Sequence, residues 1–248
     1  MTEEVIDPPP SKTAVRNAGS TIREYMRGEC SQDALDAALK TIRAYRAQFS
    51  DPLVTVQTRL RQIHQDLEMQ GEPSQKVTQR LKKSTTIVDK LVRESGLNLA
   101  RMQDIGGCRM VVETLEHLRM VEAEVRNVWG DALHHTKDYI EDPRESGYRA
   151  VHMIVVEAGQ QIEIQLRTES MHSWAMLVEA FSGIAGQNLK QDGEHLIQDF
   201  LRLMSDMTAA GELGQQPTED QLDNFRRLRD EVTEYLDAFA KEAGKDQP

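Results

Sequence analysis

Two carboxylates in the middle of the chain are placed where they could bind a metal ion. Asp104 precedes a predicted strand in MQDIGGCRMVV, and the two glycines after it allow the backbone to approach a ligand closely. Glu163 lies in IEIQL, where period-two alternation puts Glu163, Gln165 and Arg167 on one strand face. If the two strands are neighbours, both carboxylates can reach one Mg²⁺, which typically takes one or two carboxylates together with substrate phosphates. Taken alone, either residue is better explained as an ordinary solvated acid.

Basic residues gather around the first carboxylate, although the formal net charge of the chain is −11. An acidic surface opposes general binding of nucleic acid, whose phosphates must be neutralised by Lys and Arg. Residues 76–109 nevertheless hold eight basic and three acidic side chains. Such bases suit a triphosphate, although a solvated helix face with ion pairs is the usual explanation of a Lys-rich stretch. The bases that the pattern places near Asp104 are Arg80, Lys82, Lys90 and Arg109.

Phosphates would have to be held by side chains in this protein. The chain contains neither a GxxxxGK[ST] loop nor a GxGxxG fingerprint, the two glycine-rich motifs that cradle phosphates with backbone amides. Tyr148 follows Gly147 in a polar loop, where its ring has no obvious core to fill and could stack on a nucleobase. A surface tyrosine is the alternative. His152 is expected to play at most a supporting role near Tyr148.

The elements predicted to position these side chains are the strands of a sheet and the helices around it. Short β-branched and apolar runs around Val111, Thr136, Ile154 and Ile164 predict strands, and QRLKK predicts a further extended segment. An amphipathic helix is predicted over 114–130, and a hairpin turn over 157–160. Helical patterns also cover 31–49 and 51–70 and return after Thr168. We expect an α+β fold, with a mixed sheet of about five strands flanked by helices and with helical N- and C-terminal extensions.

The chain divides into four expected segments. Residues 1–18 should form a flexible arm because Pro8, Pro9 and Pro10 oppose a helix. Residues 19–73 should form N-terminal helices, 74–185 the catalytic core, and 186–248 C-terminal helices that pack in the core or form a homo-oligomer contact. No apolar run approaches the roughly 20 residues of a membrane span, and the first residues lack the features of a signal peptide, so we expect a cytoplasmic protein without membrane contact.

Four motifs in this order resemble the synthetase domain of the RelA/SpoT family, which makes the alarmones ppGpp and pppGpp. They are RLK with Thr86, Ile87 and Lys90 downstream, DIGGCR at 104–109, KDYIEDPRESGYRAVH at 137–152 and EIQLRT at 163–168. The resemblance covers roughly residues 50–185. It implies transfer of the β,γ-pyrophosphate of ATP to the ribose 3′-oxygen of GDP or GTP, with AMP as the second product. This is an in-line displacement at phosphorus, which depends mainly on positioning and charge neutralisation.

The resemblance also implies a role for each matching residue. Asp104 and Glu163 would hold Mg²⁺, and Glu163 would also activate the attacking 3′-hydroxyl. ATP would be bound by Arg80, Lys82, Lys90 and Arg109, and further phosphate contacts would come from Lys137 and Arg144. The acceptor site would contain His152, Gln165 and Tyr148, whose ring would stack on guanine.

The loop around Tyr148 departs from the family pattern. PKxNGYQS is replaced by PRESGYRA, so that Arg144, Ser146, Arg149 and Ala150 stand where the family has Lys, Asn, Gln and Ser. Loss of the Asn amide removes a possible base-reading partner, so the sequence identifies the acceptor less firmly than the donor ATP. Pyrophosphorylation of tRNA 3′ ends or of adenosine nucleotides, as in some small relatives, remains an alternative. A catalytically silent nucleotide-binding relative is another. The chain has no room for the hydrolase and regulatory domains of long members, so we expect a small stand-alone synthetase and favour a homotetramer.

Overall fold

The structure is a computed structural model that describes residues 9–69, 71–185 and 196–243. Its contacts divide the chain into two compact units. The first unit comprises 1–110, 123–136 and 153–165, and the second comprises 111–122, 137–152 and 166–248. Within the described residues, no helix combines the length and the apolar character needed to cross a membrane.

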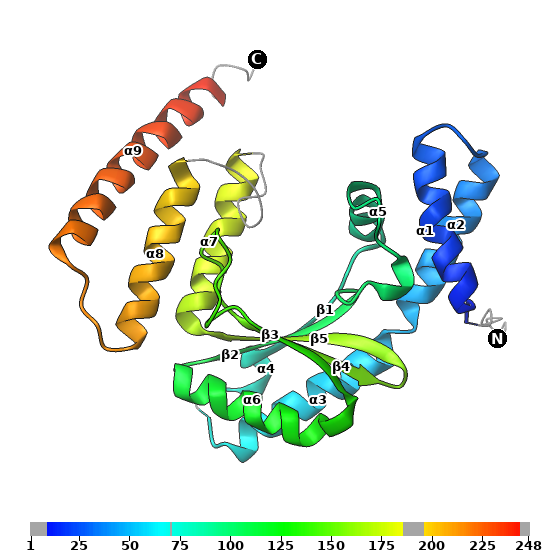
Figure 1. Cartoon of the computed structure of the whole chain (residues 1–248), viewed down its shortest axis with the longest axis horizontal. Coiled ribbons are helices and arrows are strands. Elements are labelled where there is room, and N and C mark those ends of the chain that lie inside the picture. The colour runs from blue at the N-terminus through cyan, green and yellow to red at the C-terminus, as the bar shows by residue number, and fades with distance from the viewer. Residues whose placement is uncertain (1–8, 70, 186–195, 244–248) are drawn as a thin grey trace. The chain divides into compact units, whose positions relative to one another are not determined.

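The elements follow the expected order of helices, sheet and helices (Figure 1). The strands are β1 Val77–Leu81, β2 Gly106–Val112, β3 Leu133–Asp138, β4 Val151–Glu157 and β5 Gln160–Thr168. The helices before and between the strands are α1 Lys12–Met26, α2 Gln32–Ala47, α3 Ser50–Asp66, the single turn α4 Pro73–Lys76, α5 Ser84–Arg93 and α6 Leu115–Trp129. The C-terminal helices are α7 Glu169–Ala185, α8 Leu196–Glu212 and α9 Glu219–Ala243. The predicted α+β fold with five strands is confirmed.

The five strands form one sheet in the order β1-β2-β5-β4-β3. β1 and β2 are antiparallel, and Arg80 lies opposite Gly107. β4 and β5 are joined through Ala158 and Gly159, whose φ angles of 47° and 79° are typical of a two-residue hairpin turn. The predicted hairpin is therefore confirmed. The β2–β5 pairing also brings together the two strand regions that carry the predicted metal ligands.

Side chains along β5 alternate between the core and the open face of the sheet, as predicted from IEIQL. Ile162, Ile164 and Leu166 are fully buried, whereas Glu163 and Gln165 are half-buried on the other face. The core side of the first unit is completed by Phe49, which precedes α3 and is 1% exposed. The apolar face thus fixes the sheet in register and leaves the polar face available for chemistry.

The expected flexible arm is wrong for the residues that the structure describes. Helix α1 begins at Lys12, and the side chain of Ser11 accepts a hydrogen bond from the amide of Ala14, which satisfies one of the open amides of the first turn. Val15 and Ile22 are buried on the inner face of this helix. The prolines therefore precede a capped, packed helix, and residues 1–8 of the predicted arm lie outside the described residues.

In the second unit, α8 packs against both α7 and α9. The indole nitrogen of Trp174 on α7 donates to the carbonyl oxygen of Leu201 on α8 at 2.7 Å. This buried bond fixes α8 against the segment that follows β5, while Leu228 and Val232 supply the apolar contacts of α9. The predicted C-terminal helices are present, with 186–195 and 244–248 outside the described residues.

Candidate active site

In the first unit, Asp104 is the centre of a small cluster of charges. One of its carboxylate oxygens, Oδ2, accepts hydrogen bonds from the ammonium groups of Lys82 at 2.7 Å and Lys90 at 3.0 Å. Lys82 directly follows β1, where its backbone amide donates to the carbonyl of Ile105 at 2.8 Å. Lys90 comes from the last turn of α5. Three separate segments therefore converge on one carboxylate.

The electrostatics of this cluster keep the carboxylate ionised. Burial alone would raise the pKa of Asp104, but hydrogen bonds and charges from Lys82 and Lys90 outweigh that effect, so its pKa lies below the ordinary value. The second carboxylate oxygen, Oδ1, is buried and has no hydrogen-bond partner among the described residues. A buried, ionised oxygen without a donor is a fitting ligand for a hard cation such as Mg²⁺.

Glu163 lies on the strand beside β2. The backbone oxygen of Glu163 is 3.4 Å from the point where Gly107 would carry a side chain, so the two residues are neighbours across the strands. The carboxylate of Glu163 accepts a hydrogen bond from the amide of Gln165 at 2.7 Å. Two predicted residues are thus joined directly, and the amide limits the orientations of the carboxylate.

The position of Gly106 shows which face of the sheet carries these groups. A side chain at Gly106 would lie 2.9 Å from Ile162 and 3.2 Å from Phe49, so this glycine faces the core. Because strand residues alternate between faces, Gly107 and Arg109 face the opposite way, as Glu163 does. The expectation that both glycines admit a ligand is therefore wrong for Gly106, whose missing side chain makes room for the core.

The same alternation places the other predicted bases on the open face. Arg80 is paired with Gly107, and Thr78 with Arg109, whose guanidinium donates to the Thr78 hydroxyl at 3.4 Å. Paired residues of neighbouring strands share a face, so Arg80 and Arg109 lie on the face of Glu163. Arg80 is exposed. All the residues predicted for ATP and metal therefore belong to the first unit: Arg80, Arg109 and Glu163 share one sheet face, and Asp104 forms its own cluster with Lys82 and Lys90.

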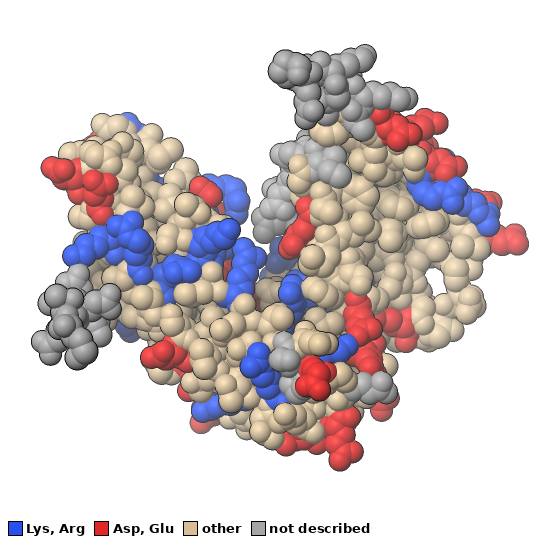
Figure 2. All heavy atoms as spheres, turned by 180° about the vertical axis from the view of Figure 1, so that it is seen from behind, with Lys and Arg blue, Asp and Glu red and all other residues tan. Residues whose placement is uncertain are grey.

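Lys and Arg side chains also gather visibly on the face of the molecule drawn in Figure 2. This grouping occurs although the whole chain carries a formal net charge of −11. Segregation of charge creates a local positive potential that attracts polyanions such as triphosphates.

Within the described residues, no three His, Cys, Asp or Glu side chains form a cluster that could hold a metal ion by themselves. A cation bound by Asp104 and Glu163 would need further oxygen ligands from a substrate or water.

In the second unit, two of the predicted acceptor residues, His152 and Arg144, lie beside Tyr148. Its hydroxyl is 2.6 Å from Nε2 of His152 and accepts a hydrogen bond from the guanidinium of Arg167 at 2.9 Å. Arg144 lies over the same ring, 5.5 Å from its centroid, and donates to the hydroxyl of Tyr139 at 2.9 Å. The structure thus brings Tyr148, His152 and Arg144 together, as the sequence predicts.

The ring of Tyr148 is buried, with 6% of the residue exposed. It belongs to an apolar cluster with Tyr139 and Trp174, whose ring centroids lie 5.7 and 6.3 Å away. The expectation that this ring has no core to fill is therefore wrong. The contact with Trp174 comes from α7, and no local sequence signal reports such a distant partner.

Two residues of this group were missed as site residues. Tyr139 contacts two cations: Lys137 lies 5.2 Å and Arg144 4.6 Å from its ring centroid. Arg144 also donates a hydrogen bond to its hydroxyl. Arg167 is 6% exposed and contacts Tyr148 from β5. Period-two alternation already placed Arg167 on the polar face of β5, which is the signal that could have identified it. Lys137 contacts the group through Tyr139, as a cation beside an aromatic ring.

Comparison with known proteins shows which family this chain is similar to. Residues 79–182 match the protein-family model described as "Region found in RelA / SpoT proteins". GTP pyrophosphokinase YjbM of Bacillus subtilis is 28% identical over 193 residues, which cover 73% of this chain and 85% of that protein. The chloroplastic protein described as probable GTP diphosphokinase CRSH of Arabidopsis thaliana is 32% identical over 149 residues, covering 54% of this chain but 24% of that protein.

Solved structures have the same fold. Small alarmone synthetase 2 of Bacillus subtilis superposes with a TM-score of 0.56 at 22% identity, over 68% of this chain and 92% of that chain. Small alarmone synthetase 1 of Bacillus subtilis, in a crystal structure with its product pppGpp, gives 0.55 at 23% identity over 77% of this chain and 99% of that chain. The fold, the order of the motifs and the matched region lead to one conclusion: residues 79–182 form a domain of the RelA/SpoT family.

Proposed function

We propose that this protein is a small alarmone synthetase, which transfers the β,γ-pyrophosphate of ATP to the 3′-hydroxyl of GDP or GTP. The observation that carries the proposal is the environment of Asp104, an ionised carboxylate with two lysines on one oxygen and no donor on the other. A site of this kind holds both signs of charge that a triphosphate and its divalent ion require. The relatives named as GTP pyrophosphokinases support the same activity.

The bases of the first unit bind and neutralise the donor in this proposal. Lys82 and Lys90 donate to the carboxylate of Asp104, and they would exchange this partner for phosphate oxygens when ATP binds. Arg80 and Arg109 lie on the same open sheet face and add guanidinium groups, which can hold phosphate oxygens in pairs. The ion pairs with Asp104 therefore keep the lysines near the site, and charge neutralisation for the substrate is prepared before it binds.

Asp104 and Glu163 would hold the divalent ion, whose charge reduces the repulsion between the triphosphate and an approaching oxygen. Glu163 also accepts the proton of the 3′-hydroxyl as that oxygen attacks the β-phosphorus. The bond between the β-phosphorus and the bridging oxygen to the α-phosphorus breaks, and AMP leaves with that oxygen. Gln165, which donates to the Glu163 carboxylate at 2.7 Å, orients the base.

Tyr148 and the residues predicted with it bind the acceptor in this proposal. Tyr148 would stack on the guanine base, with His152 and Gln165 beside the nucleotide and with Lys137 and Arg144 near its phosphates. Lys137 and Arg144 lie against Tyr139 and bring positive charge to the tyrosine pair. Because 6% of Tyr148 is exposed, the ring must become more accessible before a base can stack on it.

The reaction is tested with ATP labelled in the γ-phosphate, Mg²⁺, and one acceptor at a time: GDP, GTP, ATP or tRNA. We expect labelled 3′-pyrophosphorylated guanosine nucleotide and an equal amount of AMP on chromatography. Label on tRNA or on an adenosine nucleotide instead would assign the alternative acceptors. Binding of nucleotide without any AMP release would identify a catalytically silent relative and reject the proposal.

We also propose a cytoplasmic homo-oligomer, with a tetramer favoured. The long helix α9 supports this assembly: its residues include Leu228 and Val232 buried against α8, while Phe239 on the same helix is 42% exposed. An exposed aromatic ring on an amphipathic helix is a suitable subunit contact. Light scattering coupled to gel filtration should give a mass of four chains, and a monomer would reject the assembly.

A further inference from the structure

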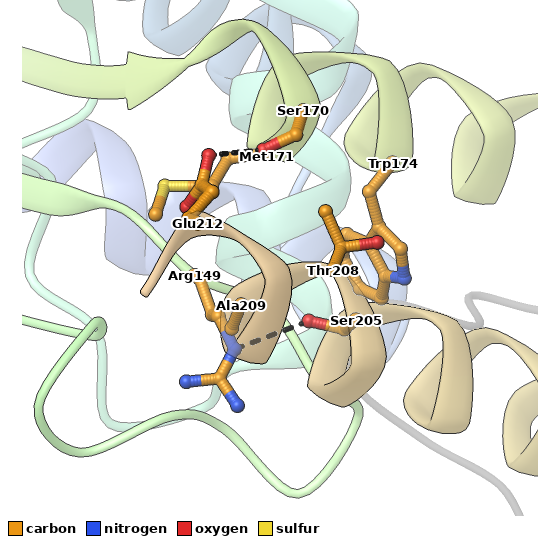
Figure 3. A pocket seen from close by; sticks show the side chains of 8 residues that line it. All are labelled: Arg149, Ser170, Met171, Trp174, Ser205, Thr208, Ala209 and Glu212. Carbon is orange, nitrogen blue, oxygen red and sulfur yellow. Dashed lines mark hydrogen bonds between the residues drawn. The ribbon is translucent and has the colours of Figure 1, made fainter. Parts of the chain in front are cut away.

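Arg149 connects the loop of Tyr148 to helix α8. Its guanidinium donates to the hydroxyl of Ser205 at 3.2 Å and to the carboxylate of Asp206 at 2.8 Å. It also donates to the carbonyl oxygen of Ile140 at 3.3 Å, at the other end of the same loop. Figure 3 shows the side chain of Arg149 between the loop and α8, with its bond to Ser205 as a dashed line. One side chain thus joins both ends of the loop to a helix more than 50 positions away.

A second contact attaches the backbone of the loop to the same helix turn. The hydroxyl of Ser205, which is 5% exposed, donates to the carbonyl oxygen of Gly147 at 2.5 Å. Gly147 has a φ of +87°, and a side chain there would lie 3.0 Å from the Cα of Arg202. The loop can therefore approach α8 this closely only because glycine occupies this position.

These contacts enclose the residue that the proposed function places against the acceptor base. Tyr148 stands between Gly147 and Arg149, so the residues on both sides of it are held by α8. The loop has little regular structure of its own: its internal backbone bonds include Gly147 to Arg144 at 2.8 Å and Arg144 to Tyr148 at 3.3 Å. Without an external support, such a loop loses conformational entropy when a ligand orders it, which weakens binding.

We propose that Arg149, Ser205 and Asp206 are positioning residues, and that α8 thereby sets the affinity of the protein for its acceptor nucleotide. This inference rests on the proposed function. Helix α8 lies outside residues 79–182, which match the RelA/SpoT family, so the chain supports its acceptor loop with a segment beyond the matched domain. Arg149 is also one of the residues at which this loop departs from the family pattern, and its partners on α8 give that departure a physical role.

Substitution of Asp206 is the sharpest test, because this side chain is 52% exposed and its loss should not prevent folding. Asp206→Asn removes the ion pair, and Arg149→Ala removes all three donations. We expect the KM for GDP or GTP to rise about threefold and about tenfold, respectively, because hydrogen bonds to charged groups contribute more than neutral ones. The KM for ATP and the kcat at saturating acceptor should stay within about twofold of wild type, since neither residue contacts the donor cluster.

Asp199→Asn is the matched control, since Asp199 forms an exposed ion pair with Arg202 on the same helix. It should leave both KM values unchanged. The double variant Arg149→Ala with Asp206→Ala should raise the acceptor KM no more than Arg149→Ala does, because the two residues share one interaction. An unchanged acceptor KM in Arg149→Ala, or an equal rise in the KM for ATP, would overturn the positioning role.

Amide hydrogen exchange separates this inference from the proposed function. In Asp206→Asn and Arg149→Ala, the amides of residues 144–150 should exchange faster than in wild type and in Asp199→Asn. Wild-type protein that forms no pyrophosphorylated product with any acceptor would reject the proposed function, whatever the exchange rates. Unchanged exchange of the loop amides would overturn the support of the loop by α8, even in an enzyme with full activity.

Discussion

Replacement of Asp104 by Asn tests the charge cluster at the centre of the proposed donor site. Asn keeps the size of the side chain but removes its charge, so Lys82 and Lys90 lose the carboxylate that lies 2.7 and 3.0 Å from their ammonium groups. Hydrogen bonds to charged groups contribute about 1.5–3 kcal/mol each when buried. The three side chains are 13%, 24% and 28% exposed, so solvent screens part of this contribution.

We therefore expect Asp104→Asn to lower the free energy of unfolding by about 2 kcal/mol without ligand. For a chain of this size that corresponds to a fall in Tm of about 4–8 °C, measured by calorimetry or circular dichroism. Turnover should fall by about 100-fold or more, because the substitution also removes a ligand of the divalent ion. A folded variant with near-normal turnover would remove Asp104 from the metal site, and an unchanged Tm would show that its ion pairs with Lys82 and Lys90 do not stabilise the fold.

The same variant makes the pH dependence of stability informative. The pKa of Asp104 is lower in the folded protein than its ordinary value, because the lysines outweigh the effect of burial. A carboxylate with a lowered folded pKa stabilises the protein fully above its unfolded pKa, and this stability is lost as the pH falls through the folded pKa. The difference in unfolding free energy between wild type and Asp104→Asn should therefore be constant from pH 7 to about 5 and shrink below about 4. A difference that grows on acidification would contradict the assignment.

Further predictions concern the contact of Gly147 with α8 and the hydrogen bond from Arg46 to the backbone of Lys82. Gly147→Ala should destabilise the protein by about 2–3 kcal/mol, because both its φ of +87° and the α8 backbone 3.0 Å away oppose a side chain. Gly159→Ala is the control, with a φ of +79° and open space around it, and should cost about 1 kcal/mol in thermal denaturation; equal losses would mean that α8 does not press on the loop. Arg46→Gln removes the hydrogen bond from Nε to the carbonyl oxygen of Lys82 at 2.7 Å. Because this bond positions Lys82, which the proposal places against ATP, the KM for ATP should rise about threefold while the acceptor KM stays unchanged. Arg43→Gln, an exposed change on the same helix α2, should have no effect, and a matching rise in that control would assign the result to the helix as a whole.

The sheet and its polar face could be predicted because they follow from local patterns. Period-two alternation in IEIQL gives the face of Glu163 and Gln165, and Ala158 with Gly159 fits the hairpin that joins β4 to β5. Alternation also put Arg167 on the polar face, although its contact with Tyr148 needs the folded chain. The prediction of a flexible N-terminal arm was wrong because prolines oppose a helix only where they stand, whereas Ser11 directly after them caps one.

Long-range packing accounts for what the sequence could not give. Gly106 faces the core because Ile162 and Phe49 occupy the space beside it, and these neighbours lie more than 50 residues away along the chain. Tyr148 is buried by Trp174 on α7. A local pattern contains no information on such partners, so a tyrosine in a polar loop is predicted to be exposed.

Phosphorus NMR of one reaction mixture tests the central claim most directly. Wild-type protein is incubated with ATP, GTP and Mg²⁺, and the spectrum is followed as the substrates are consumed. The proposed reaction predicts two new coupled resonances of a pyrophosphate on the 3′-oxygen of guanosine, together with AMP that accumulates in a one-to-one ratio. ADP and inorganic phosphate in place of AMP, or AMP with free pyrophosphate, would show that the protein cleaves ATP without transferring pyrophosphate to guanosine, and would contradict the proposed function.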